Sequence, residues 1–78
     1  MQKAIVMCRV KPNTEIDVYN RIVNLRGVLD IYQVFGEWDI VAIVEVDDIK
    51  NLDELVTKKI RINENIKNTV TMIVAKGD

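Results

Sequence analysis

The sequence has 78 residues, of which 11 are basic and 12 acidic, so the formal net charge is −1, and 49% of the residues are apolar. One small domain fits in this length, and the composition excludes a disordered polyanion, a histone-like basic protein and a two-domain enzyme. The longest apolar runs, Ala4 to Cys8 and Ile40 to Val44, have five residues each. Neither a membrane helix nor the apolar region of a secretory signal fits in such a run, so we expect a cytoplasmic protein.

The small size predicts self-association. In domains below about 80 residues, one hydrophobic core rarely provides enough stability, and disulfides, a metal or partner chains usually add to it. Cys8 is the only cysteine and histidine is absent. An internal disulfide is therefore impossible, and the commonest ligand of structural zinc is missing. Association with further copies of the chain is the remaining means of stabilisation.

The first residues predict a strand followed by a helix. Lys3 to Val10 consists of β-favouring residues. Thr14, with Asp17 three residues later, resembles the capping box of a helix start. Gly27 stands where the end of a helix favours a residue with positive φ. The apolar face of this helix comprises Val18, Tyr19, Ile22 and Leu25.

The middle of the chain predicts a hairpin and a second helix. Val28 to Phe35 and Trp38 to Val46 have strand character, and only Gly36-Glu37 separates them, so they are expected to pair as an antiparallel hairpin. Asn51 and Glu54 have the spacing of a capping box. The apolar stripe of the second helix comprises Leu52, Leu55, Val56 and Ile60.

A last strand over Ile66 to Ala75 completes the order β-α-β-β-α-β within one domain of residues 1–78. This order favours an α+β ferredoxin-like sandwich: a four-stranded antiparallel sheet with two helices on one face. The strands are apolar on both sides, for example Ala4 and Val6 on one side of the first strand and Ile5 and Met7 on the other. Two helices cover only one face of a sheet, so we expect the other face to pack against another subunit.

Three motifs carry a resemblance to a known family. They are Arg26-Gly27-Val28, the hairpin Tyr32-Gln33-Val34-Phe35-Gly36-Glu37-Trp38-Asp39-Ile40-Val41, and Thr69-Val70-Thr71-Met72-Ile73-Val74 in the last strand. The hairpin contains a glycine, a variable residue, an aromatic residue and an aspartate, and the last strand contains Thr-x-Thr. With these motifs in this order, the chain resembles the effector-binding (RAM) domain of the Lrp/AsnC transcription regulators.

The sequence departs from the family pattern in two respects. Asn65-Ile66 stands where family members often have Gly-Val, and asparagine tolerates the left-handed backbone nearly as well as glycine. Regulators of this family also carry an N-terminal helix-turn-helix, which these residues do not provide. We therefore expect a stand-alone module that acts on DNA only through partners.

The resemblance implies a homodimer joined through the sheet faces, and dimers that assemble into larger rings. It also implies that a free amino acid binds as effector between dimers, and that full-length Lrp/AsnC-type regulators are possible partners. No cofactor, enzymatic activity, membrane contact or direct nucleic-acid contact is implied. The implied function is a regulatory module in which effector binding shifts the assembly state.

The candidate effector site comprises Gly36, Glu37, Trp38, Asp39, Thr69 and Thr71. A free amino acid requires acceptors for its ammonium and donors for its carboxylate, and the hairpin turn and the threonine hydroxyls offer both. Each residue also has a structural interpretation. In that interpretation Gly36 only provides positive φ and Asp39 a local cap, Trp38 packs in the core, and threonine serves as a good strand former.

Other chemistry has little support in the sequence. Cys8 lies amid strand residues and is expected to be a small buried residue. A nucleophilic role is not expected, because no histidine is present to activate it. Asp47, Asp48, Asp53 and Glu54 lack the spacing of a calcium loop. Three alternatives stay open: a small enzyme of the dimeric α/β-barrel kind, a purely structural assembly subunit, and an ACT-like regulatory domain whose sheets pair side by side.

Overall fold

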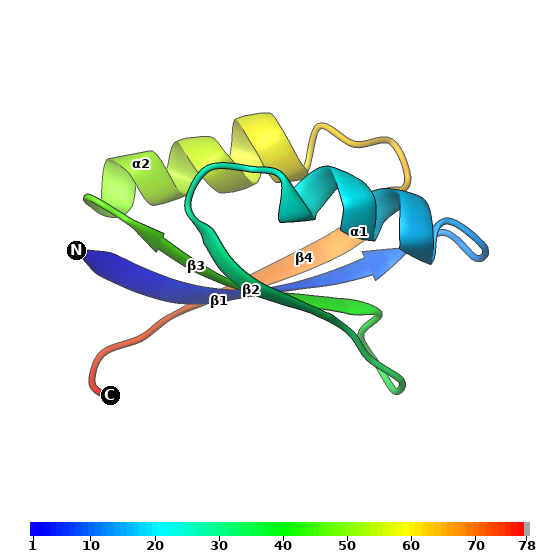
Figure 1. The fold of residues 1–78 in the computed structure, drawn as a ribbon, viewed down its shortest axis with the longest axis horizontal. Helices are drawn as coiled ribbons and strands as arrows, with labels where there is room; N and C mark the ends of the chain where they lie inside the picture. Colours follow the sequence, from blue (N-terminus) through cyan, green and yellow to red (C-terminus); the bar gives the residue numbers. More distant parts are fainter. Residues whose placement is uncertain (78) are drawn as a thin grey trace.

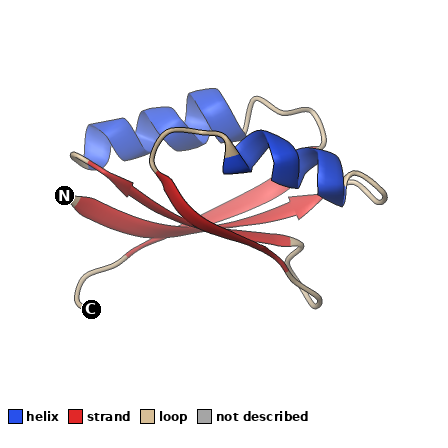
Figure 2. Cartoon of the chain, viewed as in Figure 1, coloured by secondary structure: helices blue, strands red, loops and turns tan. Residues whose placement is uncertain are grey.

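The computed structural model describes residues 1–77. Both helices lie on one side of a twisted sheet, and no helix of residues 1–77 covers the other side (Figures 1 and 2). No helix within the described residues is long and apolar enough to cross a bilayer. The elements in chain order are β1 (Gln2–Val10), α1 (Glu15–Val23), β2 (Val28–Gln33), β3 (Ile40–Val46), α2 (Ile49–Glu54), the π-helical segment η1 (Leu55–Ile60) and β4 (Ile66–Ile73).

The four strands form one sheet in the order β2-β3-β1-β4, and every neighbouring pair is antiparallel. The order places β1 and β3 at the centre and β2 and β4 at the edges. This is the ferredoxin-like arrangement that the sequence predicts.

The core lies between the helices and the sheet. Alternate residues of β1 from Ala4 to Val10 are buried, and so are alternate residues of β3 from Ile40 to Val44. Their helical partners are the predicted apolar faces. The buried residues of these faces are Val18, Ile22, Leu52, Leu55, Val56 and Ile60. Cys8 belongs to this core, and its burial raises the pKa of the thiol to about 11.

The face without helices is apolar, as predicted. On this face Ile5 lies opposite both Ile43 and Met72, and Met7 lies opposite both Val41 and Val70. The strand register therefore gathers side chains of three adjacent strands into one patch. We call this patch the open face; it comprises Ile5, Met7, Val41, Ile43, Val70 and Met72. Val70 and Met72 are 39% and 45% exposed in the monomer.

Both predicted capping boxes are wrong. The Thr14 hydroxyl donates backward to the carbonyl of Lys11 at 2.6 Å, and it forms no bond to the helix it precedes. The second helix is capped by Asp48, whose carboxylate accepts from the N–H of Asn51 at 2.8 Å. The helix thus begins at Ile49, three residues before the predicted start.

The hairpin connection is longer than predicted. β2 ends at Gln33 and β3 begins at Ile40, so residues 34–39 form the loop in place of Gly36-Glu37 alone. Asp39 ties the end of the loop in place: its main-chain N–H donates to the carbonyl of Cys8 at 3.0 Å, and its carbonyl accepts from Val34 at 2.9 Å. We call residues 34–39 the hairpin loop.

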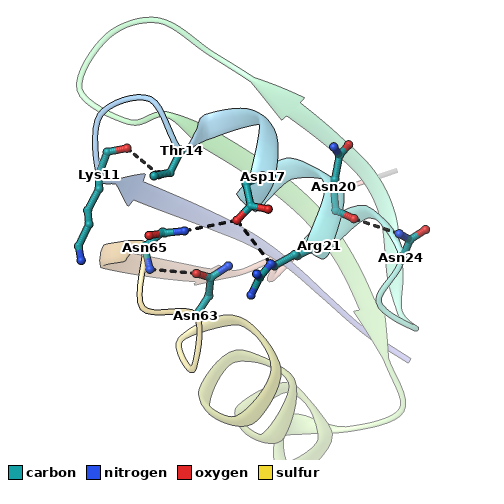
Figure 3. A network of polar contacts seen from close by, with 8 residues as sticks. All are labelled: Lys11, Thr14, Asp17, Asn20, Arg21, Asn24, Asn63 and Asn65. Atoms are coloured by element: carbon teal, nitrogen blue, oxygen red, sulfur yellow. Dashed lines mark hydrogen bonds and ion pairs between the residues drawn. The ribbon is translucent and has the colours of Figure 1, made fainter.

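Two further backbone predictions have different outcomes. Gly27 has φ +98° as predicted, although α1 already ends at Val23 and Gly27 lies in the turn to β2. Asn65, in contrast, does not adopt the left-handed backbone expected at that position. Its N–H donates to the side chain of Asn63 and its own amide donates to Asp17, so side-chain bonds hold this turn instead (Figure 3).

Candidate functional site

Asp39 attaches the hairpin loop to the end of β1. Its carboxylate Oδ2 accepts the N–H of Val10 at 2.8 Å, a bond between residues 29 positions apart. The N–H of Asp39 also donates to the carbonyl of Cys8. Asp39 therefore forms hydrogen bonds with two main-chain groups at the end of β1, the carbonyl of Cys8 and the N–H of Val10. The carboxylate therefore has a structural role, but it serves the neighbouring strand and not the turn itself.

Arg9 organises the side of the loop near the open face, a role that the sequence did not predict. Its Nε donates to the carbonyl of Glu37 at 3.2 Å, and its Nη2 lies 3.5 Å from the Glu37 carboxylate. The guanidinium also lies over the ring of Trp38, 5.0 Å from the centroid, at cation–π distance. The available signal was the alternation of β1, which places Arg9 at the end of the stripe containing Ile5 and Met7.

Trp38 is not a core residue, so that alternative is wrong. It is half-buried and lies outside the buried cluster, beneath Arg9 at the edge of the loop. A half-exposed arginine–indole pair of this kind combines positive charge with apolar surface, which suits contact with a ligand or another subunit.

The tip of the loop projects into solvent. Gly36 has φ +131°, and no atom lies within 4 Å of where its Cβ would stand. The preceding residue, Phe35, is fully exposed. The apolar ring of Phe35 is therefore open to contact with another molecule. The sequence showed this residue only as the end of a strand.

Thr69 and Thr71 share one face of β4, which is the helix side. They lie opposite Cys8 and Val6 of β1, whose side chains belong to the core. The helices nevertheless leave this edge strand uncovered, since Thr69 is half-buried and Thr71 exposed. Thr69 and the base of the hairpin loop therefore flank the end of β1 from opposite sides, with that strand between them.

The candidate residues and Arg9 supply hydroxyls, carboxylates and a guanidinium at this end of the sheet. Since Asp39 is engaged with Val10, the exposed carboxylate is that of Glu37, which is 76% exposed and shared with Arg9. No group of three or more metal-ligating side chains occurs among residues 1–77. The arrangement therefore offers groups that can donate and accept hydrogen bonds to a ligand.

Comparisons with known proteins give a consistent result. The family model of the Lrp/AsnC ligand-binding domain matches residues 3–77. An uncharacterised HTH-type transcriptional regulator of Pyrococcus furiosus is 32% identical over 73 residues, which cover 90% of this chain and 49% of the regulator. The chain thus spans about half the length of this curated relative. A homocitrate synthase of Sulfolobus acidocaldarius is 28% identical over a segment covering 16% of that enzyme.

Solved structures share the fold. A protein from Thermus thermophilus has a TM-score of 0.95 and 31% identity, and the match covers 100% of this chain and 98% of that one. A feast or famine regulatory protein from M. tuberculosis, complexed with L-methionine, has a TM-score of 0.83 and 26% identity; the match covers 99% of this chain and 52% of that one. On the match over residues 3–77 and these likenesses, the chain belongs to the Lrp/AsnC ligand-binding domain family.

Proposed function

We propose that this domain assembles through its open face and binds a free amino acid at the end of the sheet that carries the hairpin loop. The observation that carries the proposal is the apolar open face, which no helix covers. Exposed apolar patches that span several strands mark contacts with other chains. A second copy fits best, because the chain is too small to stand securely on its own core.

The effector site is proposed at the hairpin loop and β4, between assembled subunits. Glu37 would accept from the ligand ammonium, while the hydroxyls of Thr69 and Thr71 and the exposed backbone at Gly36 would bind its carboxylate. Trp38 would line the site, and Asp39 would position the loop through Val10. Because the threonines and the loop flank β1 from opposite sides, a second subunit is needed to complete one site.

Regulation would then follow from linkage. A ligand bound between subunits stabilises the assembly that contains its site, by the difference in its affinity for the two states. The M. tuberculosis relative was solved with L-methionine, which supports the amino-acid class. Mixed assembly with full-length Lrp/AsnC-type regulators would carry the response to DNA, and the proposal assigns no chemical reaction to this domain.

Sedimentation and calorimetry test the proposal together. The protein is expected to sediment as a dimer or larger species at micromolar concentration, and one or more of the twenty amino acids should bind with heat and change the sedimentation. Met7→Lys, at the centre of the open face, should give monomers. Ile16→Lys is the matched control, since Ile16 is 70% exposed on α1, in the helix layer.

The outcomes separate the two parts of the proposal. A stable wild-type monomer would refute assembly through the open face. An assembly that binds none of the twenty amino acids would leave the structural-subunit alternative standing and refute the effector role.

A further inference from the structure

The amide of Asn63 is a buried donor without an acceptor. The residue is only 8% exposed and lies in the turn between η1 and β4. Its Oδ1 accepts the N–H of Asn65 at 2.9 Å, which fixes the orientation of the amide. Its Nδ2 has less than 1 Å² of exposed surface and no hydrogen-bond partner among the described residues. Buried donors in folded proteins nearly always have a partner, so this nitrogen calls for an acceptor.

The main-chain N–H and carbonyl of Asn63, in contrast, both have hydrogen-bond partners. Its N–H donates to the carbonyl of Ile60 at 3.1 Å, and its carbonyl accepts from Ile66 at 3.0 Å. The unmatched group is thus a single NH₂, and it lies on the Arg21 side of the residue (Figure 3).

Asn63 lines a cavity between α1 and the end of η1. The cavity holds about 330 Å³ and has an apolar wall that includes Ile60, which is fully buried, and Ile62, which is 74% exposed. Arg21, Lys59 and Glu64 line it as well. We call it the α1–η1 cavity. Its volume is at the lower end for ligand sites, which suits a ligand of amino-acid size.

The polar groups of the cavity favour an anionic group. Two cationic side chains, Arg21 and Lys59, accompany the unpartnered amide donor. Arg21 is tied only loosely, because its Nε lies 3.5 Å from the Asp17 carboxylate and its side chain is 64% exposed. Such an exposed ion pair is weak, so the Arg21 guanidinium can leave Asp17 to pair with a ligand anion.

The backbone beside the cavity is also irregular. The last turns of this helix are π-helical, and the N–H of Arg61 donates to the carbonyl of Val56, five residues earlier, at 2.8 Å. Such segments are rare in proteins and occur frequently at functional sites.

We propose that the α1–η1 cavity binds a small aliphatic carboxylate, a class that includes aliphatic α-amino acids and their 2-oxo acids. The ligand carboxylate accepts from Asn63 Nδ2 and Arg21, with Lys59 adding positive charge. The aliphatic part lies against Ile60 and Ile62. Glu64 is positioned to accept from the ammonium of an amino acid. This site lies within one subunit and does not depend on the effector site at the hairpin loop.

Titration followed by NMR tests the site directly. The Asn63 side-chain amide and the Ile60 and Ile62 methyl groups are observed while L-leucine, its 2-oxo acid 4-methyl-2-oxopentanoate, or 3-methylbutylamine is added. Both carboxylates are expected to shift these resonances saturably, and the amine, which lacks the carboxylate, is not. If leucine binds more tightly than its 2-oxo acid, and Glu64→Gln removes this difference, the ligand class is the amino acid. If the two bind equally, the cavity recognises only the carboxylate and the aliphatic tail.

Two variants with different risks to folding accompany the titration. Asn63→Leu removes the donor at similar size, and Arg21→Met removes the cation from an exposed side chain. Each should weaken binding roughly tenfold or more, as expected for loss of a hydrogen bond to a charged group. Asn20→Leu, an exposed change on α1 that is not in the cavity lining, should leave binding unchanged.

Three results would overturn the proposal. They are no saturable shift with either carboxylate, equal binding of the amine, or undiminished affinity in Arg21→Met. Binding that disappears with changes at Thr69 and Thr71 but survives Arg21→Met would place the ligand at the hairpin site instead.

Discussion

The bond between Asp39 and Val10 makes a testable contribution to stability. Asp39→Ala removes an ionised acceptor from a main-chain N–H at 2.8 Å in a partly buried position. Hydrogen bonds to charged groups contribute about 1.5–3 kcal/mol. We expect Asp39→Ala to lower the free energy of unfolding by that amount. For a domain of this size, each kcal/mol lowers Tm by roughly 4–8 °C.

Asp39→Asn provides the matched comparison. The asparagine retains an oxygen in the same place but carries no charge, and a neutral hydrogen bond contributes about 0.5–1.5 kcal/mol. Asp39→Asn should therefore lower the free energy of unfolding by about half as much as Asp39→Ala does. Urea unfolding followed by circular dichroism measures both, at one fixed protein concentration because assembly would couple stability to concentration. If the free energy of unfolding of Asp39→Ala lies within about 0.5 kcal/mol of the wild-type value, the bond does not hold the loop to β1.

Three further changes test the rest of the fold. Asp48→Ala should cost about 1 kcal/mol through loss of the bond to the Asn51 N–H, whereas Asn51→Ala, at the cap the sequence suggested, should cost much less; urea unfolding compares them. Gly27→Ala should cost about 1–2 kcal/mol or more, because φ is +98° and the new Cβ would lie 3.3 Å from the Glu45 carbonyl; the same assay applies. The pKa of Cys8 is raised from 9.0 to about 11. As the pH rises, the thiol of the unfolded chain loses its proton at a lower pH than the buried thiol does. The free energy of unfolding should therefore fall by roughly 2–3 kcal/mol between pH 9 and 11. An equal fall in Cys8→Ala, which has no thiol, would contradict this assignment.

The sequence was informative where burial alone decides the structure. The alternation of β1 and the apolar stripe from Leu52 to Ile60 follow from the period of strand and helix, so both faces were predicted residue by residue. Thr14 stands at the start of α1 as the sequence indicated, although its predicted side-chain cap bond is absent. The start of α2 was not predicted, because several side chains near it can accept a hydrogen bond. Asp48 and Asn51 both fit a cap, and only the direction of the incoming chain distinguishes them.

The candidate site was predictable in its residues but not in their partners. The hairpin and the two threonines follow from the family motif, yet the bond from Asp39 to Val10 spans 29 residues and no local pattern contains it. The same holds for Arg9, which acts on Glu37 and Trp38 only because β1 passes beside the loop. Asn63 is a further case, since no pattern in the sequence indicates that this polar residue is buried.

These contacts give β1 a particular place in the proposed regulation. Met7 lies at the centre of the open face, while Cys8 and Val10 hold Asp39 and with it the hairpin loop. The proposed subunit contact and the proposed effector loop are therefore separated by one to three residues of a single central strand. A shift in how two open faces pack would move Cys8 and Val10 together with Met7, and the loop would follow. Linkage between assembly and ligand binding then needs no long path through the domain. It requires only that the two packings of the open face differ in the position of this strand end.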